Sequence, residues 1–156
     1  MGGVRSSAGA GLLKWVVCEH DPVVADDVVS NQGSCMFDVA VVDLMASMQN
    51  GATLVLNEPE QIKQHGEFTK HLAPLNPSVW VSTPSFLSLA LLNGDFSAQD
   101  LPRLDTFYLA GEIVHHRLER RAHAKFPLRH VSNAYGELEQ PRTSSWGKLA
   151  KHTLTT

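Results

Sequence analysis

Apolar and polar positions along the chain follow two different periods. Short runs of β-branched and other apolar residues are typical of β-strands, and longer stretches with apolar residues three or four positions apart are typical of helices. The runs that predict strands are 28–29, 53–56, 79–82, 106–109 and 129–132. The stretches that predict helices are 8–18, 39–49, 59–72, 84–92 and the region whose buried stripe is Val114, Leu118, Ala122 and Phe126.

Capping residues place the ends of several of these helices. Asp38 is a good N-cap for the helix over 39–49, and Asn50-Gly51 is a good C-terminal stop. Thr83-Pro84 is typical of a helix start. The helix over 84–92 is apolar nearly all round and is expected to be buried, as is the strand over 53–56, whereas the polar helix over 59–72 is expected at the surface.

Alternation of strands and helices at this spacing predicts βαβ units. The expected fold is α/β, with a mostly parallel sheet and helices on both of its faces. Ligands of such sheets bind at the carboxyl ends of the strands. The loops that could carry function are therefore 33–38, 82–84, 110–112 and 133–139.

Composition limits the partners and the compartment. The chain has 156 residues, enough for one domain, and its net charge of −3 does not favour nucleic acid or anionic lipid as a partner. Cys18 and Cys35 have neither metal-ligand spacing nor the density of a disulfide scaffold, and no segment is apolar enough to cross a bilayer. We expect a soluble, cytoplasmic protein whose segment 140–156 forms a loose tail.

Common catalytic signatures do not account for the chemistry. His116, Glu119 and His123 share one helical face, but the arginines around them favour a solvated basic face over a metal site. The sequence has no nucleophile elbow, no Gly-x-x-x-x-Gly-Lys phosphate loop and no dinucleotide-binding glycine motif. The function must therefore depend on the loops after the strands.

These loops resemble those of one enzyme family. The runs NQGSCMFDVAVVDL (31–44), VWVSTPSF (79–86), FYLAGE (107–112) and NAYG (133–136) occur in the order found in adenylate-forming enzymes. They are most similar to the adenylation domains of D-alanine:carrier-protein ligases, and are also similar to those of nonribosomal peptide synthetases. The resemblance covers roughly residues 3–139, which implies a partial N-terminal subdomain of an AMP-binding adenylation domain over 1–139.

The resemblance implies a reaction and a set of site residues. An amino acid reacts with ATP and magnesium to give an aminoacyl-adenylate, and the acyl group then passes to the phosphopantetheine thiol of a carrier protein. Asp38 would bind the ammonium group of the substrate, Ala110 would line the amino-acid pocket, and Glu139 would bind magnesium. The nucleotide would contact Gly111, Glu112, Asn133, Ala134, Tyr135 and Gly136.

Structural alternatives exist for several of these residues. Asp38 could serve only as a helix cap, although one carboxylate can cap a helix and still present its other oxygen. Glu112 could cap the following helix. Tyr135-Gly136 could form an ordinary turn after a strand.

The sequence also departs from the family pattern. Glu137-Leu138 stands where the family has Pro-Thr, and Gln140-Pro141-Arg142 replaces residues such as Ala-Thr-Val. The chain retains at most Gly3-Val4 of the family's phosphate loop, and it stops before the C-terminal subdomain with its catalytic lysine. We therefore expect a fragment that is inactive alone. The alternatives are a fragment of a peptide synthetase adenylation domain and a non-catalytic α/β remnant or interaction module.

Overall fold

The computed structural model describes residues 23–32, 38–128, 130–134 and 147–148. The helix expected over 8–18 lies outside these residues. In chain order, the described elements are β1 (Val28–Asn31), α2 (Asp38–Asn50), β2 (Thr53–Leu56), α3 (Pro59–Lys63), α4 (His65–Leu72), the 3₁₀ turn η1 (Ala73–Leu75), β3 (Val79–Ser82), α5 (Pro84–Ala90), β4 (Thr106–Ala110), α6 (His116–Lys125), β5 (His130–Ala134) and β6 (Gly147–Lys148).

The strands form one sheet in the order β2-β1-β3-β4-β5-β6. The pairs from β2 to β5 are all parallel, which confirms the α/β fold with a mostly parallel sheet. β6 is antiparallel to β5, where Lys148 pairs with Ser132 and Gly147 with Asn133. Two residues of the segment expected to be a loose tail therefore belong to the sheet.

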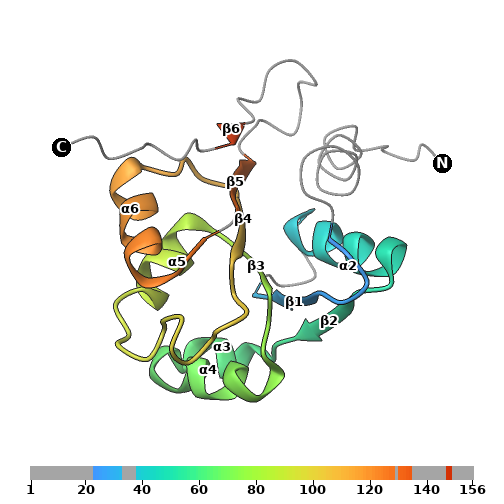
Figure 1. Ribbon diagram of the computed structural model, residues 1–156, viewed down its shortest axis with the longest axis horizontal. Helices are drawn as coiled ribbons and strands as arrows, with labels where there is room; N and C mark the ends of the chain where they lie inside the picture. The colour runs from blue at the N-terminus through green and yellow to red at the C-terminus, as the bar shows by residue number, and fades with distance from the viewer. Residues whose placement is uncertain (1–22, 33–37, 129, 135–146, 149–156) are drawn as a thin grey trace.

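Helices cover both faces of the sheet, as the sequence predicts (Figure 1). Successive side chains of a strand point to opposite faces, so β3 and β4 each contribute to two separate cores. On one face, Val29, Val79 and Val81 pack with Ala46 of α2. On the other face the core includes α4, α5 and α6, and its members are Phe68, Leu72, Trp80, Leu87, Ala90, Leu91, Phe96, Leu101, Leu104, Phe107, Leu109, Val114, Ala122, Phe126, Leu128 and Val131.

The expected burial of β2 is wrong. β2 lies at the end of the sheet and pairs only with β1, so one edge of the strand has no neighbour among the described strands. Thr53 is exposed and Leu56 is 67% exposed. An apolar run of four residues does not by itself distinguish a central strand from an edge strand.

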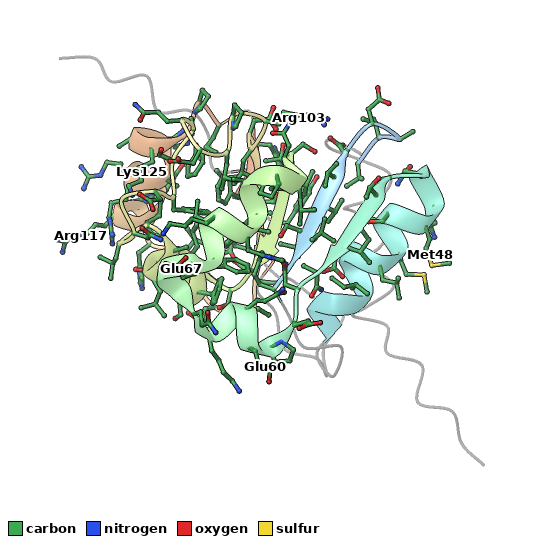
Figure 2. All side chains as sticks on the ribbon, turned by 90° about the horizontal axis from the view of Figure 1, so that it is seen from below. Met48, Glu60, Glu67, Arg103, Arg117 and Lys125 are labelled. Atoms are coloured by element: carbon green, nitrogen blue, oxygen red, sulfur yellow. The ribbon has the colours of Figure 1, made fainter. Side chains whose placement is uncertain are left out.

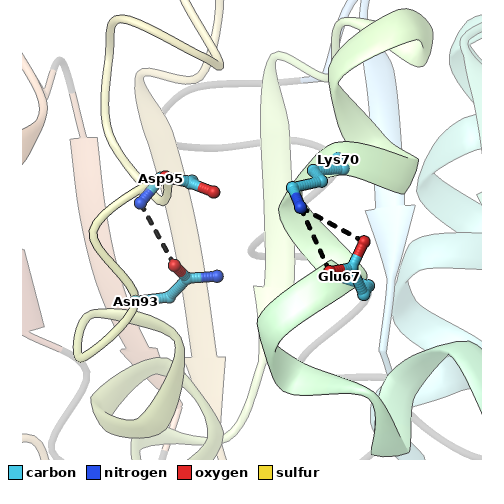
Figure 3. A network of polar contacts seen from close by, with 4 residues as sticks. All are labelled: Glu67, Lys70, Asn93 and Asp95. Carbon is cyan, nitrogen blue, oxygen red and sulfur yellow. Dashed lines mark hydrogen bonds and ion pairs between the residues drawn. The ribbon is translucent and has the colours of Figure 1, made fainter.

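The single helix expected over 59–72 is two helices. Gln64 leaves the helical region with φ −87° and ψ 63°, which ends α3. The amides of Glu67 and Phe68 then donate to the Gln64 carbonyl at 2.9 and 3.0 Å, which begins α4. The exposed side of α4 carries an ion pair of 3.1 Å between Lys70 and Glu67 (Figure 3).

α5 is shorter and more exposed than the sequence predicts. Thr83 caps it, because its hydroxyl oxygen accepts a hydrogen bond of 3.2 Å from the Phe86 amide, and the helix ends at Ala90. Only one side of α5 faces the core, which leaves Leu89 exposed, and Leu92, beyond the end of the helix, is also exposed. Beyond the helix, the Asn93 side chain accepts a 3.1 Å hydrogen bond from the Asp95 amide (Figure 3).

The outer side of α2 is apolar. Met48 is 71% exposed and lies on the side of α2 that faces away from the sheet (Figure 2). None of the helices in the described ranges has both the length and the apolar character needed to span a membrane.

Candidate functional site

The carboxyl ends of the parallel strands meet at one edge of the sheet. β1 leads through α2 to β2 on one side, and the chain then crosses back to β3 on the other side of β1. The carboxyl ends of β1 and β3 therefore flank a topological switch point, where α/β sheets bind their ligands. Asp38 follows β1, Ala110 ends β4, and Asn133 and Ala134 end β5, so these predicted site residues lie toward the same edge.

Two predicted groups of ligand-binding residues are neighbours in the sheet. Leu109 pairs with Asn133 and Ala110 pairs with Ala134 in the parallel register of β4 and β5. The sequence suggested that Asn133 and Ala134 lie in the loop after the strand. Instead, both residues lie within β5. The Oδ1 atom of Asn133 is buried and has no hydrogen-bond partner among the described residues, so its acceptor capacity is unused within that part of the chain.

Gly111 directly follows β4 and has φ +89°, a conformation that favours glycine. A Cβ atom built at this position would meet only the Thr83 methyl group, at 4.0 Å. No other atom of the described residues lies within 4 Å of that position, so these residues leave space beside the backbone at the end of β4.

Glu112 does not cap the next helix. The N-cap of α6 is His115, and the Glu112 carboxylate instead accepts a hydrogen bond of 2.5 Å from the Ser85 hydroxyl. Ser85 lies in the first turn of α5, so this bond ties the loop after β4 to the start of α5. Glu112 therefore lies at the expected edge, but one of its oxygens is engaged within the chain.

A polar cluster at the ends of β1 and β2 was not predicted. The Asn31 side-chain amide donates to Asp43 of α2, and the Asn57 amide donates to the Asn31 carbonyl. Asp43 is 1% exposed. Burial raises the pKa of Asp43 from 3.8 to about 6, against the opposing effect of hydrogen bonds from Asn31 and the Leu44 amide. The sequence signal for this polar cluster was Asp43 itself, a lone aspartate among the apolar residues of the helix.

The remaining predicted residues are only partly described. α2 begins at Asp38 itself, one residue before the predicted helix, and this end of α2 follows the carboxyl end of β1. Tyr135, Gly136 and Glu139, together with the departures at 137–138 and 140–142, lie outside the described residues.

A metal centre does not emerge from the part of the chain that the structure describes. His116 Nδ1 lies 3.4 Å from Glu119, and within those ranges no group of three or more His, Cys, Asp or Glu residues is placed to hold a metal ion. Glu139, the expected magnesium ligand, also lies outside these ranges.

The comparison with known protein families identifies the family of this chain. The family described as AMP-binding enzyme matches residues 6–140, nearly the whole sequence. The chain belongs to the AMP-binding enzyme family. The segments 33–38, 82–84, 110–112 and 133–139 lie within the part of the chain that this family matches.

Curated members of the AMP-binding family share substantial identity with the chain. The D-alanine--D-alanyl carrier protein ligase of Bacillus licheniformis is 34% identical over 139 residues, which cover 88% of this chain and 28% of the ligase. The ligase of the same name from Bacillus cytotoxicus is 30% identical over 126 residues, covering 81% of this chain and 25% of that protein. The chain thus spans about a quarter of the length of these relatives.

Solved structures of adenylation domains share the fold. The nonribosomal peptide synthetase FmoA3 superposes with a TM-score of 0.76 at 22% identity, covering 91% of this chain and 15% of the other. The Vibrio cholerae adenylation domain AlmE was solved with glycyl-adenosine-5'-phosphate. It superposes with a TM-score of 0.75 at 22% identity, covering 95% of this chain and 27% of AlmE. At this identity the superpositions establish the fold alone, and they agree with a partial N-terminal subdomain.

Proposed function

We propose that this chain is the part of an ATP-dependent amino-acid adenylating ligase that carries the amino-acid pocket and part of the adenine site. D-alanine is the favoured substrate, because curated relatives that are 30 to 34% identical are D-alanine--D-alanyl carrier protein ligases. The observation that carries this proposal is the register of β4 and β5, which aligns Ala110 with Ala134 beside Asn133, whose Oδ1 has no hydrogen-bond partner among the described residues.

The proposed reaction has two steps. The substrate carboxylate attacks the α-phosphorus of ATP, which forms an aminoacyl-adenylate and releases pyrophosphate. The phosphopantetheine thiol of a carrier protein then attacks the acyl carbon and releases AMP. This chain supplies no covalent nucleophile, so its contribution to either step is to bind and orient the reactants.

The strand order suits a ligand with two ends. β1 and β5 are separated by β3 and β4, so at about 4.8 Å per strand their ends lie roughly 14 Å apart. In our proposal the Asn133 oxygen accepts a hydrogen bond from the adenine amino group at the β5 end. The Asp38 carboxylate accepts a hydrogen bond from the amino-acid ammonium at the β1 end.

The paucity of cysteine favours a reducing compartment, so the reaction is placed in the cytoplasm.

A chimeric ligase tests the proposal. This chain would replace the aligned part of the B. licheniformis ligase, with Glu137→Pro, Leu138→Thr, Gln140→Ala, Pro141→Thr and Arg142→Val restoring the family pattern. We expect D-alanine-dependent exchange of pyrophosphate into ATP. Asp38→Asn should lower this activity about ten- to a hundredfold, because it removes a charge-assisted hydrogen bond.

Controls separate the loss of a ligand contact from a loss of folding. Asn caps helices as well as Asp does, so Asp38→Asn should leave the melting temperature unchanged. Asp26→Asn, at an exposed aspartate outside the site, should leave both activity and stability unchanged. Full activity in the Asp38→Asn chimera would show that Asp38 is only a helix cap and that the substrate assignment is wrong.

The same chimera distinguishes the alternative functions. A panel of amino acids that favours another substrate over D-alanine would indicate a peptide synthetase type of domain. A folded chimera that activates no amino acid would favour the non-catalytic remnant or interaction module. The chain alone should give only background exchange, since it aligns with 28% of the ligase and each missing charge-stabilising donor can cost about 10²- to 10³-fold in rate.

A further inference from the structure

The polar cluster at the ends of β1 and β2 links three elements. The Asn31 amide donates to Asp43 Oδ2, the Leu44 amide donates to Asp43 Oδ1 at 2.8 Å, and the Asn57 amide donates to the Asn31 carbonyl. The cluster thus joins the last residue of β1, the middle of α2 and the residue after β2. It lies at the switch point, where the sheet is expected to bind its ligand.

In the part of the chain that the structure describes, the strands packed against α2 carry no cation to compensate the charge of Asp43 when it ionises. α2 lies against β1, β2 and β3, and none of these strands contains a titratable residue. On α2 itself the only other titratable residue is Asp38, which carries the same charge. Burying a carboxyl group costs stability unless its oxygens are hydrogen-bonded, and both oxygens of Asp43 accept hydrogen bonds.

We propose that Asp43 is a positioning residue, whose hydrogen bond to Asn31 holds the first turns of α2, and with them Asp38, against the carboxyl end of β1. Asp38 precedes Asp43 by five residues, about 7.5 Å along the helix axis. The importance of this role for catalysis rests on the proposed function, in which Asp38 binds the substrate ammonium. The positioning itself does not depend on any ligand.

Protonation should weaken this connection. Both oxygens of Asp43 accept hydrogen bonds, and a protonated carboxyl group loses acceptor strength at the oxygen that carries the proton. Because burial brings the pKa of Asp43 to about 6, the change falls close to neutral pH. The position of the first turn of α2 should therefore depend on pH in this range.

Nuclear magnetic resonance of the full labelled chain, titrated from about pH 4 to about pH 8, tests the proposal without a ligand. The Asn31 side-chain amide and the Asp38 backbone amide should both shift with a midpoint near pH 6. Asp43→Asn should abolish that midpoint at both positions. Asn31→Ala keeps the carboxyl group but removes its donor, so Asp43 should still titrate while the Asp38 amide no longer follows it.

Asp27→Asn is the matched control. Asp27 is also buried, and its two oxygens accept hydrogen bonds from Val24 N at 2.8 Å and Ser78 Oγ at 2.7 Å, but it lies at the opposite end of β1. This variant should keep the midpoint near pH 6 at Asn31 and Asp38. The proposal is overturned if the Asp38 amide does not follow Asp43 in the unmodified chain, or if it still follows Asp43 in Asn31→Ala. Added D-alanine that leaves the Asp38 amide unshifted would count only against the proposed function.

Discussion

Single residues at the carboxyl edge differ in how they are engaged by the rest of the chain. Among the described residues, Asn133 Oδ1 has no hydrogen-bond partner, Gly111 has open space beside it, and Glu112 is held by Ser85. The residue types at these positions were identifiable from the sequence because each matched a motif. The hydrogen bonding of each group was not identifiable from the sequence, because it depends on residues that are far away in the chain.

Asp43 should make folding stability depend on pH. Its pKa in the folded chain, about 6, lies above the ordinary value of 3.8, so the folded state binds the proton more tightly. The stabilisation of the folded state by this tighter proton binding is complete below about pH 3.8 and is lost as pH rises through about 6. Asp43→Asn removes this pH dependence. As pH rises from about 3.8 to above about 6, the unfolding free energy of the variant should therefore increase by up to roughly 3 kcal/mol relative to that of the unmodified chain.

Chemical denaturation of both proteins across this pH range measures the effect. The informative quantity is the difference in unfolding free energy between the two proteins, since other titrating groups contribute equally to both. A difference that stays constant with pH would contradict the elevated pKa of Asp43.

Gly111→Ala should destabilise the chain through its backbone alone. At φ +89° an L-residue costs about 1 to 2 kcal/mol, while the added Cβ atom meets nothing closer than 4.0 Å. Gly94→Ala is the comparison, because that position has neither a positive φ nor a neighbour within 4 Å. Thermal unfolding should show a loss for Gly111→Ala and none for Gly94→Ala, and equal effects would refute the conformational explanation.

At the scale of elements, local signals placed the helices and strands well and their surroundings less well. Thr83-Pro84 begins α5 as expected, since the cap depends only on neighbouring backbone amides. The break at Gln64 and the exposure of Leu56 were not predicted. Both depend on where an element lies in the fold, which apolar periodicity does not specify.

Thr83→Ala should cost about 1 kcal/mol of stability, because the Phe86 amide loses its hydrogen-bond acceptor at the start of α5. Thr83→Ser keeps the hydroxyl group and should remain close to the unmodified chain. Urea denaturation of both variants checks the prediction. A loss of the same size in Thr83→Ser would point to the Thr83 methyl group, which lies near Gly111, instead of the cap.

At the scale of the whole molecule, stability depends on an aromatic core between the sheet and the helices on one face. Phe96 is fully buried, with its ring centroid 4.8 Å from that of Trp80 and 5.0 Å from that of Phe126. It comes from the loop after α5 and not from a regular element. The core thus joins β3, this loop and the end of α6.

Phe96→Ala should cost about 3 to 5 kcal/mol, the usual range for deleting a buried aromatic ring. Leu92→Ala, at a side chain that is 71% exposed in the same loop region, should change stability by less than about 0.5 kcal/mol. Equilibrium unfolding followed by tryptophan fluorescence compares the two. Similar losses would indicate that the loop contributes little to the core.

The sequence by itself determined the class of fold, the alternation of strands and helices, and the family. These features follow from local periodicity, capping residues and ordered motifs such as FYLAGE and NAYG, which require no knowledge of distant contacts. Tertiary structure alone decided that β2 is an edge strand, that Asn133 pairs beside Leu109, and that Asn31 binds a buried Asp43. The physical reason is that strand order and side-chain partners join residues far apart in the chain, and burial then sets their exposure and pKa.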